Sequence, residues 1–433
     1  MERVTTITAA VRAPLTADRR YAAAVTFVLL GLIDICVLGL FSHHGDVAFA
    51  LALPGAKVKV PTVHVPGAAA CFVLGGISIG LGALRAAADL PGQGGRLELS
   101  RAARRLTIAA ALLCFVLALL CWAGAGSLPL NLVNLLQGTL AASIPLILGA
   151  LAGCMCERSG VINIAIEGQL LFGAFTAAIV ASAFGGLWVG LVAGSLAGGL
   201  VGLLLAVFAI TFLTDQIILG VVLNVLALGM TDYLYDRLMA QNPNYNTGNT
   251  FGNIKIPLLG DIPLIGPIFF DSTIFLYITY ALIIAVQVAL FHTRWGLRVR
   301  AVGEHPTAAD TVGIPVLWTR YRNVILGGLI AGIGGAYLTI GSVGSFNQDI
   351  SSGFGYIALA ALIFGRWRPL GALAAALLFG FCKQLALVLP TLNPAVPSDI
   401  LQMAPYVATI IAVAGLVGKV RAPAADGQPY VKA

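Results

Sequence analysis

The sequence predicts an all-α polytopic integral membrane protein with about 10 to 12 transmembrane or partly spanning helices. Of its 433 residues, 59% are hydrophobic and only 10% are charged, and the mean hydropathy is +0.95. Soluble domains carry about 25% charged residues, so this composition excludes an ordinary soluble protein. A series of apolar runs approaches the ~20 residues that a helix needs to cross a bilayer. The basic residues stand at the ends of these runs, which is typical of membrane topology and not of nucleic-acid binding.

Twelve apolar runs are expected to cross the membrane, one of them shorter than the others. They cover 21–41, 66–88, 106–126, 128–155, 160–183, 186–212, 216–236, 271–291, 323–341, the short run 353–365, 370–389 and 401–418. Twelve crossings place both termini on one side. With that side cytoplasmic, 20 of the 25 Lys and Arg residues belong to inside segments or the inner ends of runs. Those outside are Lys57, Lys59, Arg237 and Lys255, and Lys383 lies in the middle of a span. We therefore expect a multi-pass protein of the bacterial plasma membrane with cytoplasmic N- and C-termini.

The N-terminal part offers few chemical signals. The run 21–41 is longer than the ~7–15 apolar residues of a signal peptide, so it is expected to be an anchor. Asp34 within it either faces a water-filled cavity or pairs with a neighbouring helix. The histidines His43, His44 and His64 lack metal-ligand spacing, which favours a surface loop. The seven cysteines lie in or beside apolar runs, so free thiols are expected and no metal site.

The stretch 157–175, ERSGVINIAIEGQLLFGAF, interrupts the apolar pattern. If it is helical, Gly160, Asn163 and Glu167 share one face. Polar groups between two membrane-grade segments indicate a broken helix or an internal site, because unpaired polar groups are costly in hydrocarbon. A cytoplasmic turn with a solvated Glu157–Arg158 pair explains the first half of the stretch but not Glu167.

Two other runs carry small or polar residues at helical spacing. In run 216–236, one face holds Gln216, Gly220, Asn224, Ala227 and Thr231. Such a stripe either lines a pore or lets helices approach closely, and the sequence leaves both open. In run 323–341, the spacing of Gly328 and Gly332 favours helix packing.

A short internal repeat relates the segments 160–173 and 353–365, which share a Gly, an Ile-Ala-Ile/Leu triplet and a Phe-Gly pair. By the crossing count, the first runs from inside to outside and the second from outside to inside. Inverted-topology repeats have this opposition, and their interface carries substrate sites in transporters. The match is short and rich in common residues, so chance is the alternative.

The loop 292–322 is the longest charged cytoplasmic loop. Pro306 suits a first helical turn, Gly313 suits the end of a helix and Pro315 bars continuation, so we predict a helix of about two turns over 306–312. An ordinary connector has about 2–8 residues, so this loop is expected to dock on a partner. Small side chains suited to a partner's groove are those of Thr307, Ala308 and Ala309.

Three long blocks together are specific to one family. They are the stretch 157–175, WGLRVRAVGEHPTAADTVGIPV and GFGYIALAALIFGRWRPLGALAAALLFG. They resemble the permease subunits of bacterial ATP-binding-cassette importers for nucleosides and simple sugars. Ala165 stands where that family more often has Gly, and its methyl group reduces backbone freedom. The resemblance covers roughly 127–419, where we expect a permease core with inverted repeats. Residues 1–126 carry no matching motif and are expected to form an N-terminal extension with about three transmembrane helices, and 420–433 a cytoplasmic tail.

The resemblance implies an importer whose membrane path, ATPase and substrate capture belong to separate subunits. The expected partners are a second permease subunit in a heterodimer, a cytoplasmic ATP-binding subunit and an extracellular substrate-binding lipoprotein. The chain would be a transport subunit and no enzyme, with no cofactor of its own, because ATP and Mg²⁺ belong to the ATPase. In agreement, the sequence has no G-x-x-x-x-G-K-[ST] phosphate loop. Besides a small-molecule substrate and membrane lipid, no nucleic acid is expected.

Candidate residues follow from the resemblance and from side-chain chemistry. The family's coupling loop maps onto Gly303, Glu304, Pro306, Ala308, Ala309 and Gly313. Its membrane signature maps onto Asn163, Glu167 and Gly168. A nucleoside needs an apolar slot beside hydrogen-bonding groups, for which the candidates are Phe172, Asn224, Phe346, Phe354 and Tyr356. We expect Asn163 and Asn224 to face each other across one loosely built cavity.

Uptake of purine and pyrimidine nucleosides is the leading hypothesis, with alternatives left open. Permeases for pentoses, galactose-like sugars or branched-chain amino acids share the architecture. A proton-coupled carrier would titrate Asp34, Glu167 or Lys383, although the three blocks argue against it. A membrane-embedded enzyme is disfavoured, because the sequence has no G-x-S-x-G elbow and no histidine within an apolar run.

Overall fold

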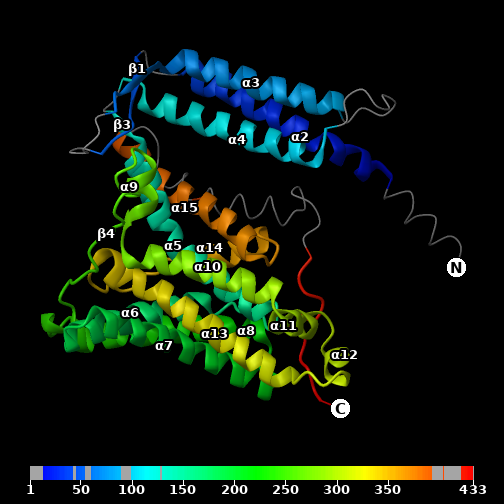
Figure 1. The fold of residues 1–433 in the computed structure, drawn as a ribbon, viewed down its shortest axis with the longest axis vertical. Coiled ribbons are helices and arrows are strands. Elements are labelled where there is room, and N and C mark those ends of the chain that lie inside the picture. The colour runs from blue at the N-terminus through cyan, green and yellow to red at the C-terminus, as the bar shows by residue number, and fades with distance from the viewer. Residues whose placement is uncertain are drawn as a thin grey trace, which may run out of the picture. The chain divides into compact units, whose positions relative to one another are not determined.

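The computed structural model describes residues 13–41, 45–53, 60–88, 99–126, 129–392, 403 and 421–432 (Figure 1). The chain forms two compact units, the first made of Met1–Asn134 with Leu387–Ser398 and the second of Leu135–Ala386 with Asp399–Ala433. The domain boundaries predicted at 126/127 and 419/420 stay predictions. Several sequence predictions lie outside the described residues: the run 401–418, His43, His44, Lys57 and Lys59.

Within the described ranges, nine helices are long and apolar enough to cross a membrane, which confirms the all-α polytopic class. These spans are Gly67–Ala88, Ala102–Gly124, Leu132–Glu157, Ile166–Phe184, Leu187–Thr211, Gln216–Met239, Ile274–His292, Val316–Val343 and Pro369–Leu392. Helix α14 (Phe354–Phe364) has 11 residues and is about 16 Å long, half of the ~30 Å hydrocarbon core. A full crossing by this segment, as expected from the sequence, does not fit its length, so the orientation of the termini stays a prediction.

The first unit is a small helical bundle closed by a sheet. Its helices pack on one another: α2 (Ala13–Ile33) with the π-helical η1 (Asp34–Gly39), α3 (Gly67–Ala88) and α4 (Arg101–Gly124). Helices α2 and α3 approach closely, since a Cβ added at Gly75 would lie 2.8 Å from the Gly31 carbonyl oxygen. The central strand β1 (Asp46–Ala50) pairs antiparallel with β2 (Val63–Pro66) and parallel with β3 (Leu130–Asn131). Asp34 is buried in this bundle.

The second unit holds the other helices. In chain order they are α5 (Leu132–Glu157), α6 (Ile166–Phe184), α7 (Leu187–Ala206) with η2 (Val207–Thr211), α8 (Gln216–Leu234) with η3 (Tyr235–Met239), η4 (Pro243–Tyr245), α9 (Ile265–Phe270), α10 (Ile274–His292), α11 (Arg294–Glu304), α12 (Pro306–Thr311), α13 (Val316–Ala336) with η5 (Tyr337–Val343), α14 and α15 (Pro369–Leu392). Between α8 and α10, the short strands β4 (Ile254–Lys255) and β5 (Asp271–Ser272) pair antiparallel.

Helices α6, α7 and α13 pack through glycines, and Figure 1 shows them side by side. A Cβ at Gly173 of α6 would lie 2.6 Å from the carbonyl oxygen of Gly332 on α13. A Cβ at Gly198 of α7 would lie 2.5 Å from the carbonyl oxygen of Gly328, also on α13. The packing role predicted for Gly328 and Gly332 is confirmed, because any side chain would push these backbones apart.

The polar stripe of α8 faces the interior of the second unit. The described buried residues of this helix are the five stripe residues with Leu223, while its other faces expose apolar side chains such as Ile218 and Val225. A Cβ at Gly220 would lie 2.8 Å from Cβ of Ile164, and the Gln216 side chain accepts the Ile162 N–H at 2.8 Å. Both partners lie in the loop between α5 and α6, so the small and polar stripe lets α8 approach that loop closely.

Candidate functional site

The two repeat-like segments meet at the N-termini of helices α6 and α14. Helix α5 ends at Glu157 and α6 begins at Ile166, so the predicted broken helix is confirmed. Gly160 and Asn163 lie in the loop between them, so they do not share a helical face with Glu167. Gly160 has a φ of +88°, a left-handed conformation that favours glycine.

Glu167 joins the two helix starts. Its carboxylate accepts the Gly353 N–H at 2.8 Å and also the Gly355 N–H. The backbones touch here, since a Cβ at Gly355 would lie 2.5 Å from Cα of Glu167. The first N–H groups of a helix have no intrahelical acceptor and carry a partial positive charge. Glu167 thus lies in the first turn of α6, and its buried carboxylate accepts the hydrogen bonds of the free N–H groups at the start of α14.

Asn224 ties α8 to the same junction. Its Oδ1 accepts the Gly168 N–H at 2.8 Å, and its Nδ2 donates to the Ile164 carbonyl at 2.9 Å. The Nδ2 group also lies 3.3 Å from the Tyr356 hydroxyl of α14. Gly168 suits this place because a Cβ there would lie 3.1 Å from the Leu223 carbonyl oxygen. The junction therefore comprises three helices.

Asn163 holds the loop instead of facing a cavity. It is fully buried, and its Nδ2 donates to Oε1 of Gln169 at 3.1 Å. The structure therefore does not place Asn163 opposite Asn224. Sequence analysis missed Gln169, although a second amide in an apolar run was a signal. Ala165, the departure from the family pattern, has φ −73° and ψ 8°, so glycine is not required there.

The aromatic candidates separate into two groups. Phe346 is fully buried, with its ring centroid 5.3 Å from that of Phe175, and it belongs to the core. Phe172 is half-buried and packs beside α7 and α8. Tyr356 is 46% exposed beside Asn224 and remains accessible. The Lys383 ammonium lies 3.6 Å from the ring centroid of Phe354, which places this cation near the α14 start.

The predicted helix over 306–312 is observed as α12, with Pro306 in its first turn. The backbone leaves the helix through Gly313, whose φ is +81°. The six residues assigned to coupling differ in exposure: Gly303 and Ala309 are buried, Pro306 is half-buried, and the exposed ones are Glu304, Ala308 and Gly313. The exposed residues can meet a partner, whereas the buried ones hold α12 in place.

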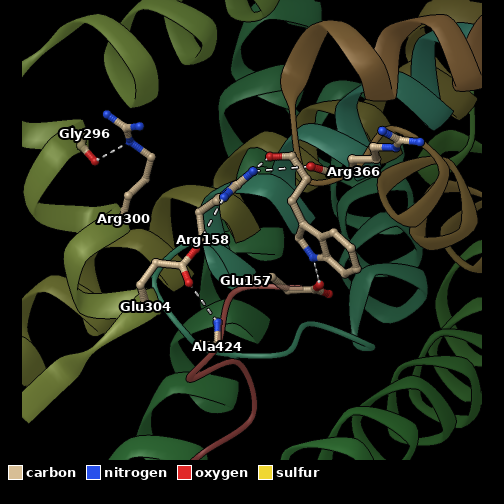
Figure 2. Close-up of polar contacts among 8 residues, drawn as sticks. Glu157, Arg158, Gly296, Arg300, Glu304, Arg366 and Ala424 are labelled. Carbon is tan, nitrogen blue, oxygen red and sulfur yellow. Dashed lines mark hydrogen bonds and ion pairs between the residues drawn. The ribbon is translucent and has the colours of Figure 1, made fainter. Parts of the chain in front are cut away.

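Arg158 connects three segments at the end of α5 (Figure 2). Its Nε donates to the Trp367 carbonyl at 2.8 Å, and its Nη1 lies 4.0 Å from Oε1 of Glu304. Glu157 is buried and accepts the indole N–H of Trp367. The pair is therefore not the solvated turn considered from the sequence. The ends of α5 and α11 are joined to the segment that follows α14.

The part of the chain that the structure describes contains no group of three or more His, Cys, Asp or Glu side chains placed to hold a metal ion. The seven cysteines are free, as expected, and most are buried. The junction at Glu167 is built from helix ends and amides. Such an arrangement can hold and release a polar small molecule, but it offers no nucleophile paired with a base.

A family model described as the permease component of the branched-chain amino acid transport system matches residues 135–414. The chain belongs to this permease family. It is therefore a multi-pass transport component of the cell membrane and not an enzyme.

Individual relatives of this permease are transport proteins as well. Over 312 residues it is 42% identical to the guanosine ABC transporter permease protein NupQ of Bacillus subtilis, which covers 69% of this chain and 96% of that one. It is 40% identical over 319 residues to the nucleoside ABC transporter permease protein NupC of Lactococcus lactis, covering 70% and 99%. A second B. subtilis guanosine permease, NupP, is 28% identical over 304 residues, covering 66% and 85%. No solved structure matches the permease.

Proposed function

We propose that this permease forms the membrane path for nucleosides in an ATP-binding-cassette importer. The observation that carries the proposal is the junction of α6, α8 and α14. Here Glu167 accepts a backbone N–H at the start of α14, and Asn224 accepts one at the start of α6. Interrupted helices of this kind build substrate sites in transporters. The nucleoside substrate is supported by the names of NupQ and NupC, which align with this permease over almost their whole length.

The substrate path passes the exposed side of the junction. Tyr356 offers a ring for the base and a hydroxyl for the ribose, and Phe354 adds a second ring beside Lys383. Asn224 and Glu167 hold Tyr356 and the start of α14 in place. The other residues predicted for the path support the junction by packing and hydrogen bonding and do not line the path. They are Asn163, Gly168, Phe172 and Phe346.

The partners divide the work. A cytoplasmic subunit hydrolyses ATP and contacts α12, whose Ala308 is exposed, and this chain binds no cofactor. A second permease subunit completes a heterodimer, as the occurrence of both NupP and NupQ in B. subtilis supports. An extracellular lipoprotein delivers the substrate. Both termini lie in the cytoplasm, together with α12.

A competition assay tests the substrate. Cells that carry the permease and its partners take up labelled guanosine, and unlabelled competitors are added one at a time. We expect other nucleosides to compete and ribose, glucose and leucine not to compete. Absence of permease-dependent guanosine uptake, or competition by a sugar or an amino acid as strong as that by nucleosides, would refute the nucleoside proposal while leaving the family assignment intact.

A further inference from the structure

The C-terminal segment 421–432 lies against the coupling helices instead of leaving the protein. Its Ala425 N–H donates to the Gly303 carbonyl at 2.9 Å, where α11 ends. The neighbouring Ala424 N–H donates to Oε2 of Glu304 at 3.2 Å, a contact drawn in Figure 2. From α13, Arg320 donates to the Gln428 carbonyl at 2.8 Å. These contacts fix the backbone of the segment at three points.

Tyr430 fills the space behind α12. It is 7% exposed and packs with one residue from each neighbouring helix, namely Val302, Ala309 and Val316. Its hydroxyl lies beside the Asp310 carboxyl of α12. Helix α12 has only six residues and cannot hold its position through its own hydrogen bonds. The inner face of α12 therefore depends on the ring of Tyr430.

Asp426 reaches the other side of the segment, toward the loop after α5. Its carboxyl lies near the carboxyl of Glu157 and the guanidinium of Arg320. Arg320 is 1% exposed, and among the described residues its Nε and Nη2 have no hydrogen-bond partner. The tail thus places an acidic side chain within electrostatic reach of this buried guanidinium. Next to it, a Cβ at Gly427 would lie 2.5 Å from Cδ1 of Ile162.

The segment thus links two parts of the permease that have different roles. On one side is α12, and on the other is the loop 158–165, which leads directly to Glu167 and the helix junction. The short segment from 426 to 430 therefore connects the ring behind α12 with the loop. Packed side chains and hydrogen bonds of this kind form a physical route for coupling.

We propose that the segment 423–430 is a working part of the coupling apparatus, in which Tyr430 and Asp426 position α12 and the loop 158–165 relative to each other. Both are positioning residues, since neither is placed against substrate or ATP. The proposal rests on the proposed function in one respect, because it takes α12 as the contact for the ATPase. It adds the tail to the loop 292–322 and the stretch 157–175, which the sequence had indicated.

The test measures the number of substrate molecules transported per ATP hydrolysed by the complete complex in proteoliposomes. Tyr430→Ala removes the ring behind α12, and Asp426→Ala removes the contact with the loop. Val431→Ala is the matched control, because Val431 is the next residue and is 70% exposed. We expect each test variant to lower the transport-to-ATP ratio at least about fivefold, the lower end of typical coupling energies. The control should keep the wild-type ratio.

A purely structural tail gives a different result. In that case transport and ATP hydrolysis fall together with the amount of folded permease and the ratio stays at the wild-type value, which would overturn the proposal. If Tyr430→Ala does not fold, Tyr430→Leu keeps an apolar side chain at the position. Its transport-to-ATP ratio then tests the proposal in the same way. Cross-linking of Ala308→Cys to the ATPase in the otherwise wild-type complex tests the proposed function separately.

Discussion

Glu167 accepts a hydrogen bond from the backbone of Gly353, 186 positions later in the chain, at 2.8 Å. This contact joins the start of α6 to the start of α14, whose first N–H groups lack partners within their own helix. Because the carboxylate also takes the Gly355 N–H, the two interrupted segments share one charge. The polar residue that stood out in an apolar run is thus the link between two distant segments.

Replacement of Glu167 tests this link. Glu167→Ala removes both acceptors and leaves two buried N–H groups unpaired, so we expect a loss of roughly 3 kcal/mol in stability and a strong loss of uptake. Glu167→Gln keeps one acceptor oxygen and should lose about half as much. Thermal unfolding of the detergent-purified variants and uptake assays should both rank wild type above Glu167→Gln and Glu167→Gln above Glu167→Ala. Wild-type uptake by Glu167→Ala would remove Glu167 from the site.

Asn224 is expected to affect rate more than substrate preference. Asn224→Ala leaves the Gly168 N–H and the Ile164 carbonyl without their side-chain partner, at a cost of about 1–3 kcal/mol. The helix junction loosens, so transport slows, whereas selection by the external lipoprotein continues. Competition assays with several nucleosides and sugars provide the measurement. A switch from nucleosides to sugars at an unchanged rate would show that the permease itself selects the substrate.

Two neighbouring residues of α12 offer a matched comparison. Ala308 is exposed and Ala309 is 3% exposed against Tyr430 and Val302. Ala308→Glu should therefore leave the permease folded and uncouple ATP hydrolysis from transport. Ala309→Glu buries a charge and should reduce the amount of folded protein. Abundance in the membrane and ATPase activity separate the two effects, and the prediction fails if both variants behave alike.

Docking of the tail should weaken as pH rises. Burial, followed by the neighbouring Glu157, raises the pKa of the Asp426 carboxyl, and Arg320 opposes this shift. The docked tail therefore binds a proton that a released tail gives up. Docking is strongest below the ordinary Asp pKa of 3.8 and declines until the raised pKa is reached.

Labelling of a cysteine introduced at Ala425, which is 3% exposed in the docked tail, reports release of the tail. Between about pH 6 and about pH 9, the rate of labelling corrected for thiolate content should increase. Asp426→Asn should flatten this dependence, because the amide does not titrate. A pH dependence that is the same with and without the carboxyl would exclude Asp426 as its source.

Some of this structure could be predicted from local sequence. Composition and apolar runs indicate the membrane class, because hydrocarbon excludes charged side chains wherever they occur along the chain. The position of α12 follows from Pro306 and Gly313, whose backbone preferences are local. The unusual place of Glu167 within an apolar run was equally visible.

Long-range partners could not be predicted in the same way. The contact of Glu167 with Gly353 depends on how distant helices pack, and the pairing of Asn163 with Gln169 depends on the path of a loop. Phe346 and Tyr356 are both aromatic, yet one is in the core and the other is exposed. The sequence predicted only a cytoplasmic tail over 420–433, because the residues that the tail contacts lie far from it along the chain.

The central claim is that this permease imports nucleosides with energy from a separate ATPase. The most direct measurement is uptake of labelled guanosine by proteoliposomes that contain the complex and an external binding protein. We expect uptake to require ATP inside the compartment that holds the ATPase, to stop when the ATPase is inactivated by mutation, and to persist when a proton uncoupler is added. Uptake that survives ATPase inactivation and collapses with the uncoupler would contradict the account.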